Sequence, residues 1–186
     1  MTEAAVLGAS ERWVRDVVVG LRLCPFAAAP LRTGRIRYVV CPAVEFEAIY
    51  RALLAEVAAF LDLPPERAET ALFVVPQGLG EFDTYLDLLA AAEAALEAAG
   101  LAGILQLASF HPDYVFADAT ADDPANYTNR SPYPMFHLIR EAGLAAALES
   151  WPDPEKIPEA NARRLRELGL AEMQRRLADC RGDSGA

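Results

Sequence analysis

The segment TALFVV, residues 70–75, is a continuous run of apolar and β-branched side chains that ends at Pro76. Short runs of this kind are typical of strands that are buried on both faces of a sheet. The prolines of LPPE, residues 63–66, separate the run from the preceding segment. We therefore expect residues 70–75 to form a strand near the centre of a sheet, and the rest of the fold is built outward from it.

Two strand-and-helix units flank this central segment. Residues 44–61 and 81–99 carry apolar side chains at spacings of three and four, the pattern of amphipathic helices. Apolar residues alternate with arginines at 35–41, and a further apolar run lies at 103–110, which predicts two more strands. The order strand–helix–strand–helix–strand contains two successive crossover units, so the sheet is predicted to be at least partly parallel.

The N-terminal segment is predicted to be a helix. Ser10 is a suitable N-cap for a helix that ends near Leu21. After it, Pro25 and Pro30 are expected to stop regular structure.

The C-terminal segment is also predicted to be helical. Pro134 suits the first turn of a helix that extends to about residue 148. A last helix is expected at 158–178, followed by a flexible tail at 179–186. Together with the N-terminal helix, these segments can cover the second face of the sheet. The prediction is a single α/β domain over residues 1–186, with a small, at least partly parallel sheet flanked by helices on both faces.

The composition limits the partners of the chain. It has 27 acidic and 17 basic residues and a net charge of −10, whereas nucleic-acid binding needs a basic surface. No apolar run reaches the length of a membrane span, and the N-terminus lacks the pattern of a signal peptide. The three cysteines form no close pair, which fits a reducing compartment. We expect a soluble cytoplasmic protein with a small-molecule ligand and no nucleic-acid or membrane partner; the sequence sets no oligomeric state.

The segment from Ser109 to Arg140 contains both histidines of the protein, His111 and His137. Its four prolines forbid a regular helix or a central strand through most of its length. A loop this long within a compact domain is normally either functional or disordered. Its tyrosines and phenylalanines argue against disorder, so we expect an ordered functional loop.

The predicted topology also indicates where a ligand would bind. In open α/β sheets, ligands bind beyond the carboxyl ends of the parallel strands. Here those ends fall at residues 41–42, 76–78 and 109–111, and the long loop begins at the third of them. We therefore place the candidate site at this edge.

Acid–base chemistry on a small polar or anionic metabolite is the first hypothesis for that site. His111 would act as the general base, since histidine titrates near neutral pH, and Asp113 or Asp123 would orient it. Arg130 and Arg140 would hold a carboxylate or phosphate through paired hydrogen bonds. The side chains expected to bind the substrate are Arg130, Asn126, Asn129, Tyr127, Asp123 and Arg140.

Two further enzymatic interpretations remain open. Cys24 could be a catalytic nucleophile if a nearby histidine stabilised its thiolate, although a small buried cysteine is an equally good interpretation. Alternatively, His111, Asp113 and His137 could supply the two histidines and the carboxylate of an iron or zinc site. His137 falls on the predicted helix, however, where a packing role is the simpler interpretation.

A non-catalytic role is the alternative from a different class. A tyrosine-rich loop stiffened by prolines is suited to a ligand-binding or interaction module. Asp, Asn and Pro residues are also those that a self-supporting turn requires, because Asp and Asn side chains bond to nearby backbone. The segment NYTNRSPYP, residues 126–134, can therefore be interpreted as a scaffold.

Three segments resemble those of the bacterial and plant family called domain of unknown function 1415. They are WVRDVVVGLRLCPFA, ASFHPDYVFA and DDPANYTNRSPYPMFHLIREA, and the likeness covers most of residues 10–145. The resemblance implies a shared fold and a shared site built from LCPF, HPDY and NYTNRSPYP, and it implies no particular activity. Combined with the topology, it leads us to expect that His111, Asp113, Asn129 and Arg130 converge on one concave pocket, with Cys24 at or near its wall.

Overall fold

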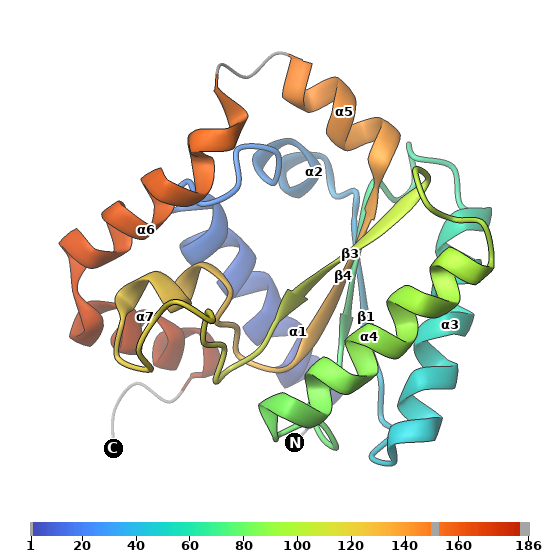
Figure 1. Cartoon of the computed structure of the whole chain (residues 1–186), viewed down its shortest axis with the longest axis horizontal. Helices are drawn as coiled ribbons and strands as arrows, with labels where there is room; N and C mark the ends of the chain where they lie inside the picture. Colours follow the sequence, from blue (N-terminus) through green and yellow to red (C-terminus); the bar gives the residue numbers. More distant parts are fainter. Residues whose placement is uncertain (1, 150–152, 183–186) are drawn as a thin grey trace.

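The computed structural model describes residues 2–149 and 153–182 and contains one four-stranded sheet with helices on both faces (Figure 1). The strands are β1 (Ile36–Val40), β2 (Thr70–Val74), β3 (Leu105–Phe110) and β4 (Met135–Arg140), in the order β1-β2-β4-β3. The protein is thus a single-domain α/β fold with a mixed sheet, as predicted, and β2 lies inside the sheet.

The direction of the strands confirms the predicted common edge. β1 and β2 are parallel, while β4 is antiparallel to both of its neighbours, β2 and β3. β3 therefore runs in the same direction as β1 and β2. The register aligns Val40 with Val74, Val74 with Met135 and Met135 with Phe110, so the carboxyl ends of the three strands meet at one edge.

Helices α3 (Phe46–Asp62) and α4 (Phe82–Ala98) cover one face of the sheet, close to the predicted ranges. Successive strand residues point to opposite faces, and Phe73 and Phe136 belong to the core formed with these two helices. Burial of their apolar stripes against the sheet is the main driving force for this layer.

The opposite face is covered by helices from both ends of the chain (Figure 1). Leu72, Val74 and Met135 pack there against apolar residues of the terminal helices. These helices are α1 (Glu3–Arg12), the π-helical turn η1 (Trp13–Val19), α6 (Ile157–Leu168) and α7 (Leu170–Arg181). Covering of the second face by both chain ends was predicted correctly.

The predicted helix from Pro134 to residue 148 is wrong in its first half, because Met135–Arg140 forms β4 and only Glu141–Glu149 forms the helix α5. The sequence MFHLIR has apolar residues at spacings that suit a helix or a strand. Pairing with β2 on one side and β3 on the other decides in favour of the strand, since it satisfies the backbone groups of β4. His137 consequently lies in the middle of the sheet and not on a helix.

Several terminal boundaries also differ from the prediction. Thr2, not Ser10, is the N-cap of α1, and the Ser10 hydroxyl donates to the Val6 carbonyl inside that helix. Pro30 lies inside a short helix, α2 (Ala28–Thr33). The last predicted helix is two helices, because Gly169, with φ of 84°, breaks it.

The predicted flexible tail, 179–186, is wrong in its first residues. Helix α7 continues to Arg181, and residues 183–186 lie outside the described part of the chain.

Candidate functional site

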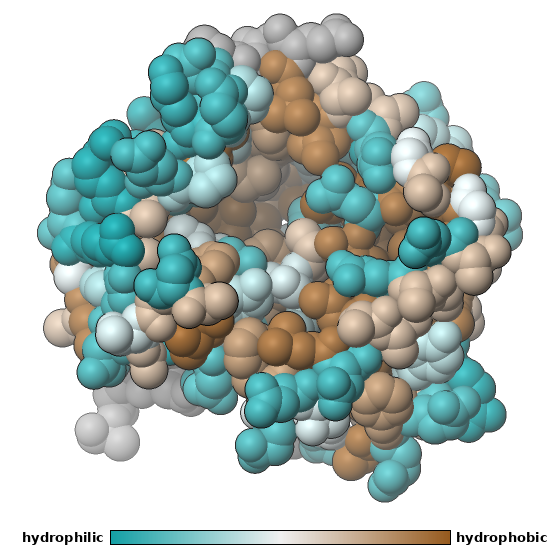
Figure 2. Space-filling model, viewed as in Figure 1, coloured by the Kyte–Doolittle hydropathy of each residue, from teal (hydrophilic) through white to brown (hydrophobic). Residues whose placement is uncertain are grey.

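A cavity with a volume of about 510 Å³ lies on the sheet face opposite α3 and α4. Its floor includes Thr70, Leu72 and His137, and its walls come from segment 13–30 and from α5. Figure 2 shows a deep hollow with hydrophobic walls below α5. The cavity therefore lies between the sheet and its covering helices, away from the carboxyl edge where the sequence placed the site.

The cavity wall is mostly apolar. Five of the lining residues carry side chains that can ionise or form hydrogen bonds, namely Cys24, Glu69, Thr70, His137 and Arg140, and a sixth, Trp13, donates its indole N–H to the Arg130 carbonyl. Apolar contacts come from aromatic and aliphatic residues, namely Trp13, Val14, Val18, Pro25, Phe26, Ala27, Ala29, Pro30, Ile36, Leu72, Ala108, Phe110, Ile139, Leu144 and Ala147, and Gly143 completes the wall. Pockets of this kind, with a few convergent polar groups, are the usual form of small-molecule sites.

Hydrogen bonding fixes the His137 ring. Its Nε2 lies 2.5 Å from the Thr70 hydroxyl, which also donates to the Leu138 carbonyl over 2.8 Å. A threonine hydroxyl has a single hydrogen, so in this arrangement Nε2 carries the imidazole proton and donates to Thr70. The tautomer leaves Nδ1 as an unprotonated acceptor.

The same histidine is held in its neutral form. Burial lowers the pKa of His137 to about 4, because an imidazolium in apolar surroundings loses its hydration. On either side of it in the sheet lie Leu72 and Ala108, which offer no compensating charge. His137 therefore presents a neutral hydrogen-bond acceptor to the cavity at physiological pH.

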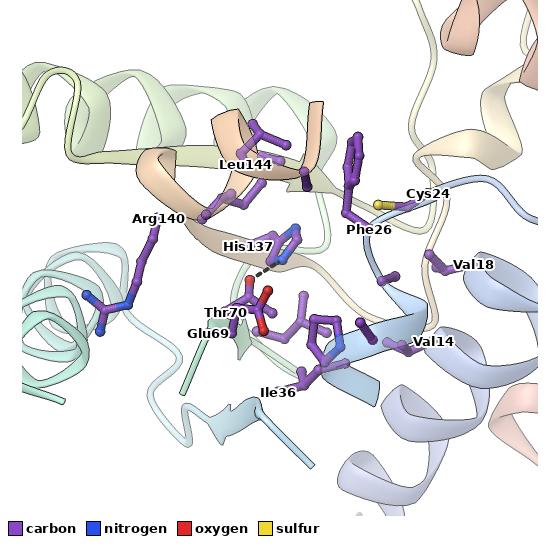
Figure 3. Close-up of a pocket in the computed structure, with 18 of the residues that line it drawn as sticks. Val14, Val18, Cys24, Phe26, Ile36, Glu69, Thr70, His137, Arg140 and Leu144 are labelled. Atoms are coloured by element: carbon purple, nitrogen blue, oxygen red, sulfur yellow. Dashed lines mark hydrogen bonds between the residues drawn. The ribbon is translucent and has the colours of Figure 1, made fainter. Parts of the chain in front are cut away.

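Cys24 lies on the cavity wall with its sulfur beside Phe26 (Figure 3). Burial raises the pKa of its thiol, an effect that hydrogen bonds from the Phe26 and Ala27 backbone partly offset. Reactive cysteines have a lowered pKa, so the shift runs in the opposite direction. With the thiol pKa raised and the His137 pKa lowered, the two groups do not form a thiolate–imidazolium pair in the unliganded protein.

The two charged residues of the wall are engaged elsewhere. Arg140 points away from the cavity (Figure 3) and donates to the carbonyls of Phe60 and Leu63, at the end of α3, over 2.6 Å each. Glu69 Oε2 lies 3.0 Å from Nη2 of Arg35. Arg140 is thus a structural cap for α3 and not the predicted anion clamp.

His111, the predicted general base, is fully buried and uses both ring nitrogens internally. Nε2 lies 2.9 Å from the Leu79 carbonyl, and Nδ1 accepts from the Asp113 backbone N–H over 3.0 Å. Its ring packs against Phe82 and Tyr85 of α4. Burial lowers the His111 pKa, so the residue is a neutral, internally bonded support for the start of the loop.

Arg130 and the two predicted asparagines also bond to their own loop. Arg130 donates to the carbonyls of Tyr114 and Ala121. Other bonds of this kind join Asn126 Oδ1 to the Phe116 N–H, Asn126 Nδ2 to the Thr120 carbonyl and Asn129 Nδ2 to the Ser109 carbonyl. These contacts satisfy backbone groups that no sheet or helix pairs, so the loop is ordered as a scaffold.

The remaining predicted site residues, Asp123, Tyr127 and Asp113, also lie outside the lining of the cavity. Asp123 caps the short helix η2 (Pro124–Thr128) by accepting from the Ala125 N–H, and it pairs with Arg166 of α6 at 2.6 Å. That pairing lowers the Asp123 pKa. Tyr127 is buried in the core beneath the Arg130 guanidinium, which lies 4.9 Å from its ring centre. The Asp113 side chain is exposed.

His111, Asp113, Asn129 and Arg130 were expected to converge on one pocket, but none of them lines this cavity, whereas Cys24 does. The proposed metal trio is also separated. Phe110 lines the cavity, so the next residue, His111, points to the other face of the sheet, opposite His137. Within residues 2–149 and 153–182, no three His, Cys, Asp or Glu side chains are grouped to hold a metal ion.

Neither Glu69 nor Thr70 was predicted from the sequence to be a site residue. A usable signal was present, because Thr70 begins the most apolar strand and His137 lies within MFHLIR. Had 135–140 been assigned as a strand, the period of two would have put Met135, His137 and Ile139 on one face. A histidine on the apolar face of a central strand is a candidate ligand contact.

The fold and the cavity define a single-domain α/β protein with an apolar binding pocket on one face of a mixed sheet. The chain belongs to the family described as "Protein of unknown function (DUF1415)", whose model matches residues 5–175. This confirms the resemblance found in the sequence.

The comparison with curated proteins and the comparison with solved structures each gave no match. In the described residues, no helix has both the length and the apolar character required to cross a bilayer.

Proposed function

We propose that this protein binds a small, largely apolar molecule in the cavity between the sheet and the helices α2 and α5. The observation that carries the proposal is an apolar cavity of about 510 Å³ with one neutral histidine, His137, at its floor. Ligand pockets typically measure ~300–1,000 Å³ and combine apolar walls with a few oriented polar groups.

The ligand we propose differs from the polar or anionic metabolite expected from the sequence. An anion needs a cation or several donors when it is removed from water. Arg140, the one arginine or lysine among the described lining residues, is directed to backbone carbonyls of α3. An apolar ligand body matches this wall better than a charged one.

Binding is proposed in preference to turnover because of the protonation states of the two candidate catalytic groups. Cys24 has a raised pKa and His137 a lowered one, so a thiolate is disfavoured. A retained thiol and a neutral imidazole provide contact surface and one acceptor, which is what a binding pocket uses.

A titration with a neutral, environment-sensitive naphthylamine dye tests this proposal. The dye is expected to bind at one site with an increase in fluorescence. Ala108→Leu from the floor and Gly143→Leu from the wall fill the cavity and should each abolish the increase; a Cβ at Gly143 meets no atom within 4 Å. Ala146→Leu, on an exposed position of the same helix, is the matched control.

Saturable binding that both filling variants remove and the control retains would support the pocket as the site. Absence of binding to the wild type, or equal binding to all variants, would contradict the proposal. Far-ultraviolet circular dichroism of each variant separates loss of binding from loss of fold.

A further inference from the structure

We infer that the ligand carries a neutral hydrogen-bond donor, such as an alcoholic or phenolic hydroxyl, which donates to Nδ1 of His137. This inference rests on the proposed function and specifies the chemical class of molecule that the cavity accepts.

Thr70 sets the tautomer of His137. Because the Thr70 hydroxyl donates to the Leu138 carbonyl, it accepts from Nε2–H of His137. The proton is therefore fixed on the nitrogen that faces the strand. Thr70 acts as a positioning residue that keeps Nδ1 free to accept a hydrogen bond.

The unprotonated ring nitrogen of His137, Nδ1, faces the cavity. In Figure 3, the ring nitrogen opposite Thr70 points into the cavity, toward Leu144 and Phe26. None of the hydrogen bonds found between described residues involves Nδ1 of His137. Its surroundings are mostly apolar, so a donor on the ligand would satisfy this open acceptor.

Charged head groups do not suit the surroundings of His137. The acceptors near His137 are the Thr70 oxygen and the Glu69 carboxylate, so a carboxylate ligand at this point would meet further negative charge. A cationic head group would meet a neutral imidazole, and the Glu69 carboxylate, whose Oε2 forms no hydrogen bond, already has the Arg35 guanidinium as its ionic partner at 3.0 Å. Transfer of either charge from water without a partner is costly, whereas a hydroxyl requires a single acceptor.

A series of naphthalenes with one ring system and different substituents tests the head group by calorimetric titration. Naphthol donates, methoxynaphthalene only accepts, naphthoate is anionic, naphthylmethylamine is cationic, and naphthalene has no polar group. We expect naphthol to bind about tenfold more tightly than methoxynaphthalene, the effect of one hydrogen bond in an apolar site. Naphthoate is expected to bind at least roughly a hundredfold more weakly than naphthol.

The series separates the two proposals. If no member binds, the cavity is not a ligand site and both proposals fail. If all members bind alike, the proposed function stands and the hydroxyl inference fails. Tighter binding of naphthylmethylamine than of naphthol would identify Glu69 as the anchor and overturn the assignment to His137.

His137→Phe removes the acceptor and keeps a ring of similar shape. In this variant the ratio of naphthol to methoxynaphthalene affinity is expected to fall from about ten to about one. A ratio that is unchanged in His137→Phe would overturn the inference. The wild-type ratio remains decisive if this variant fails to fold.

Discussion

At the residue scale, the two histidines have opposite relations to their surroundings. His111 has both ring nitrogens bonded within the protein, to Leu79 and to the backbone of Asp113. His137 has one nitrogen bonded to Thr70 and the other directed into a cavity. The first arrangement stabilises a loop, and the second offers a contact to a ligand.

His137 should make the stability of the protein depend on pH. Its pKa is about 4 in the folded protein and near 6.5 when unfolded, so between these values the unfolded state binds more protons. The contribution of His137 is therefore fully present above about pH 6.5 and is lost as the pH falls toward the folded value. We expect the free energy of unfolding to fall by ~2 kcal/mol from this residue between pH 7 and pH 5.

Urea titrations of the wild type and His137→Phe at both pH values measure that contribution. The other titrating groups, including His111, are common to both proteins, so the difference isolates His137. Parallel pH dependence in the two proteins would show that His137 is not held neutral.

Replacement of His111 should affect stability and not binding. His111→Ala leaves the Leu79 carbonyl and the Asp113 N–H without their partner and opens a space between Phe82 and Tyr85. We expect a loss of about 3 kcal/mol in the free energy of unfolding. The dye should still bind under native conditions.

Asp113→Ala is the control for that variant, because the exposed Asp113 side chain makes no bond to the ring; its backbone does. It is expected to change stability by less than about 0.5 kcal/mol. A His111→Ala protein with unchanged stability and lost binding would restore His111 as a site residue.

At the scale of elements, α5 is the wall of the cavity that depends least on the core. No side chain among its described positions is buried, and Gly143, Leu144 and Ala147 face the cavity. The other walls are held by the sheet and by the packed helix that contains Trp13. A ligand in the cavity would supply apolar contacts that α5 lacks, so binding is expected to raise the stability of this helix.

Gly143→Ala should stabilise the protein by ~0.5–1 kcal/mol, since glycine inside a helix has more freedom to lose on folding than alanine. The added Cβ meets no atom within 4 Å. Thermal unfolding monitored by circular dichroism measures the effect.

Gly100→Ala provides the contrast. Its Cβ would also meet no atom within 4 Å, but its φ is 71°, a conformation that alanine adopts only with strain. A lower melting temperature is expected for this variant. If both substitutions changed the melting temperature in the same direction, the backbone conformation at Gly100 would not determine the effect.

At the scale of the whole molecule, the sequence predicted the layers of the fold better than its full topology. The periods of α3 and α4 and the apolar run of β2 are local signals, and the structure confirms all three. Strand β4 was not predicted, because MFHLIR suits either period and its pairing with β2 and β3 is a long-range effect. Pro134 lies immediately before this strand, and because proline is common in the first turn of a helix, it favoured the incorrect helix assignment.

The location of the site could be predicted only in part. Cys24 lines the cavity, although it was expected at the wall of another pocket, because the polar loop from His111 to Pro134 was interpreted as the site itself. Its Asn and Arg side chains satisfy loop backbone, a role that the sequence alone cannot separate from ligand binding. A cavity arises where helices fail to fill the space over a sheet, and no local motif records such a gap.

Protection of Cys24 from alkylation tests most directly whether the cavity is a ligand site. Cys24 lines the cavity and is partly exposed, whereas Cys41 and Cys180 are buried, so the other two thiols serve as internal controls. Peptide mass spectrometry would follow the alkylation of each thiol at increasing naphthol concentrations. We predict that the rate at Cys24 falls in proportion to site occupancy, while the slow rates at Cys41 and Cys180 stay constant; an unchanged rate at Cys24 under saturating naphthol would contradict the account.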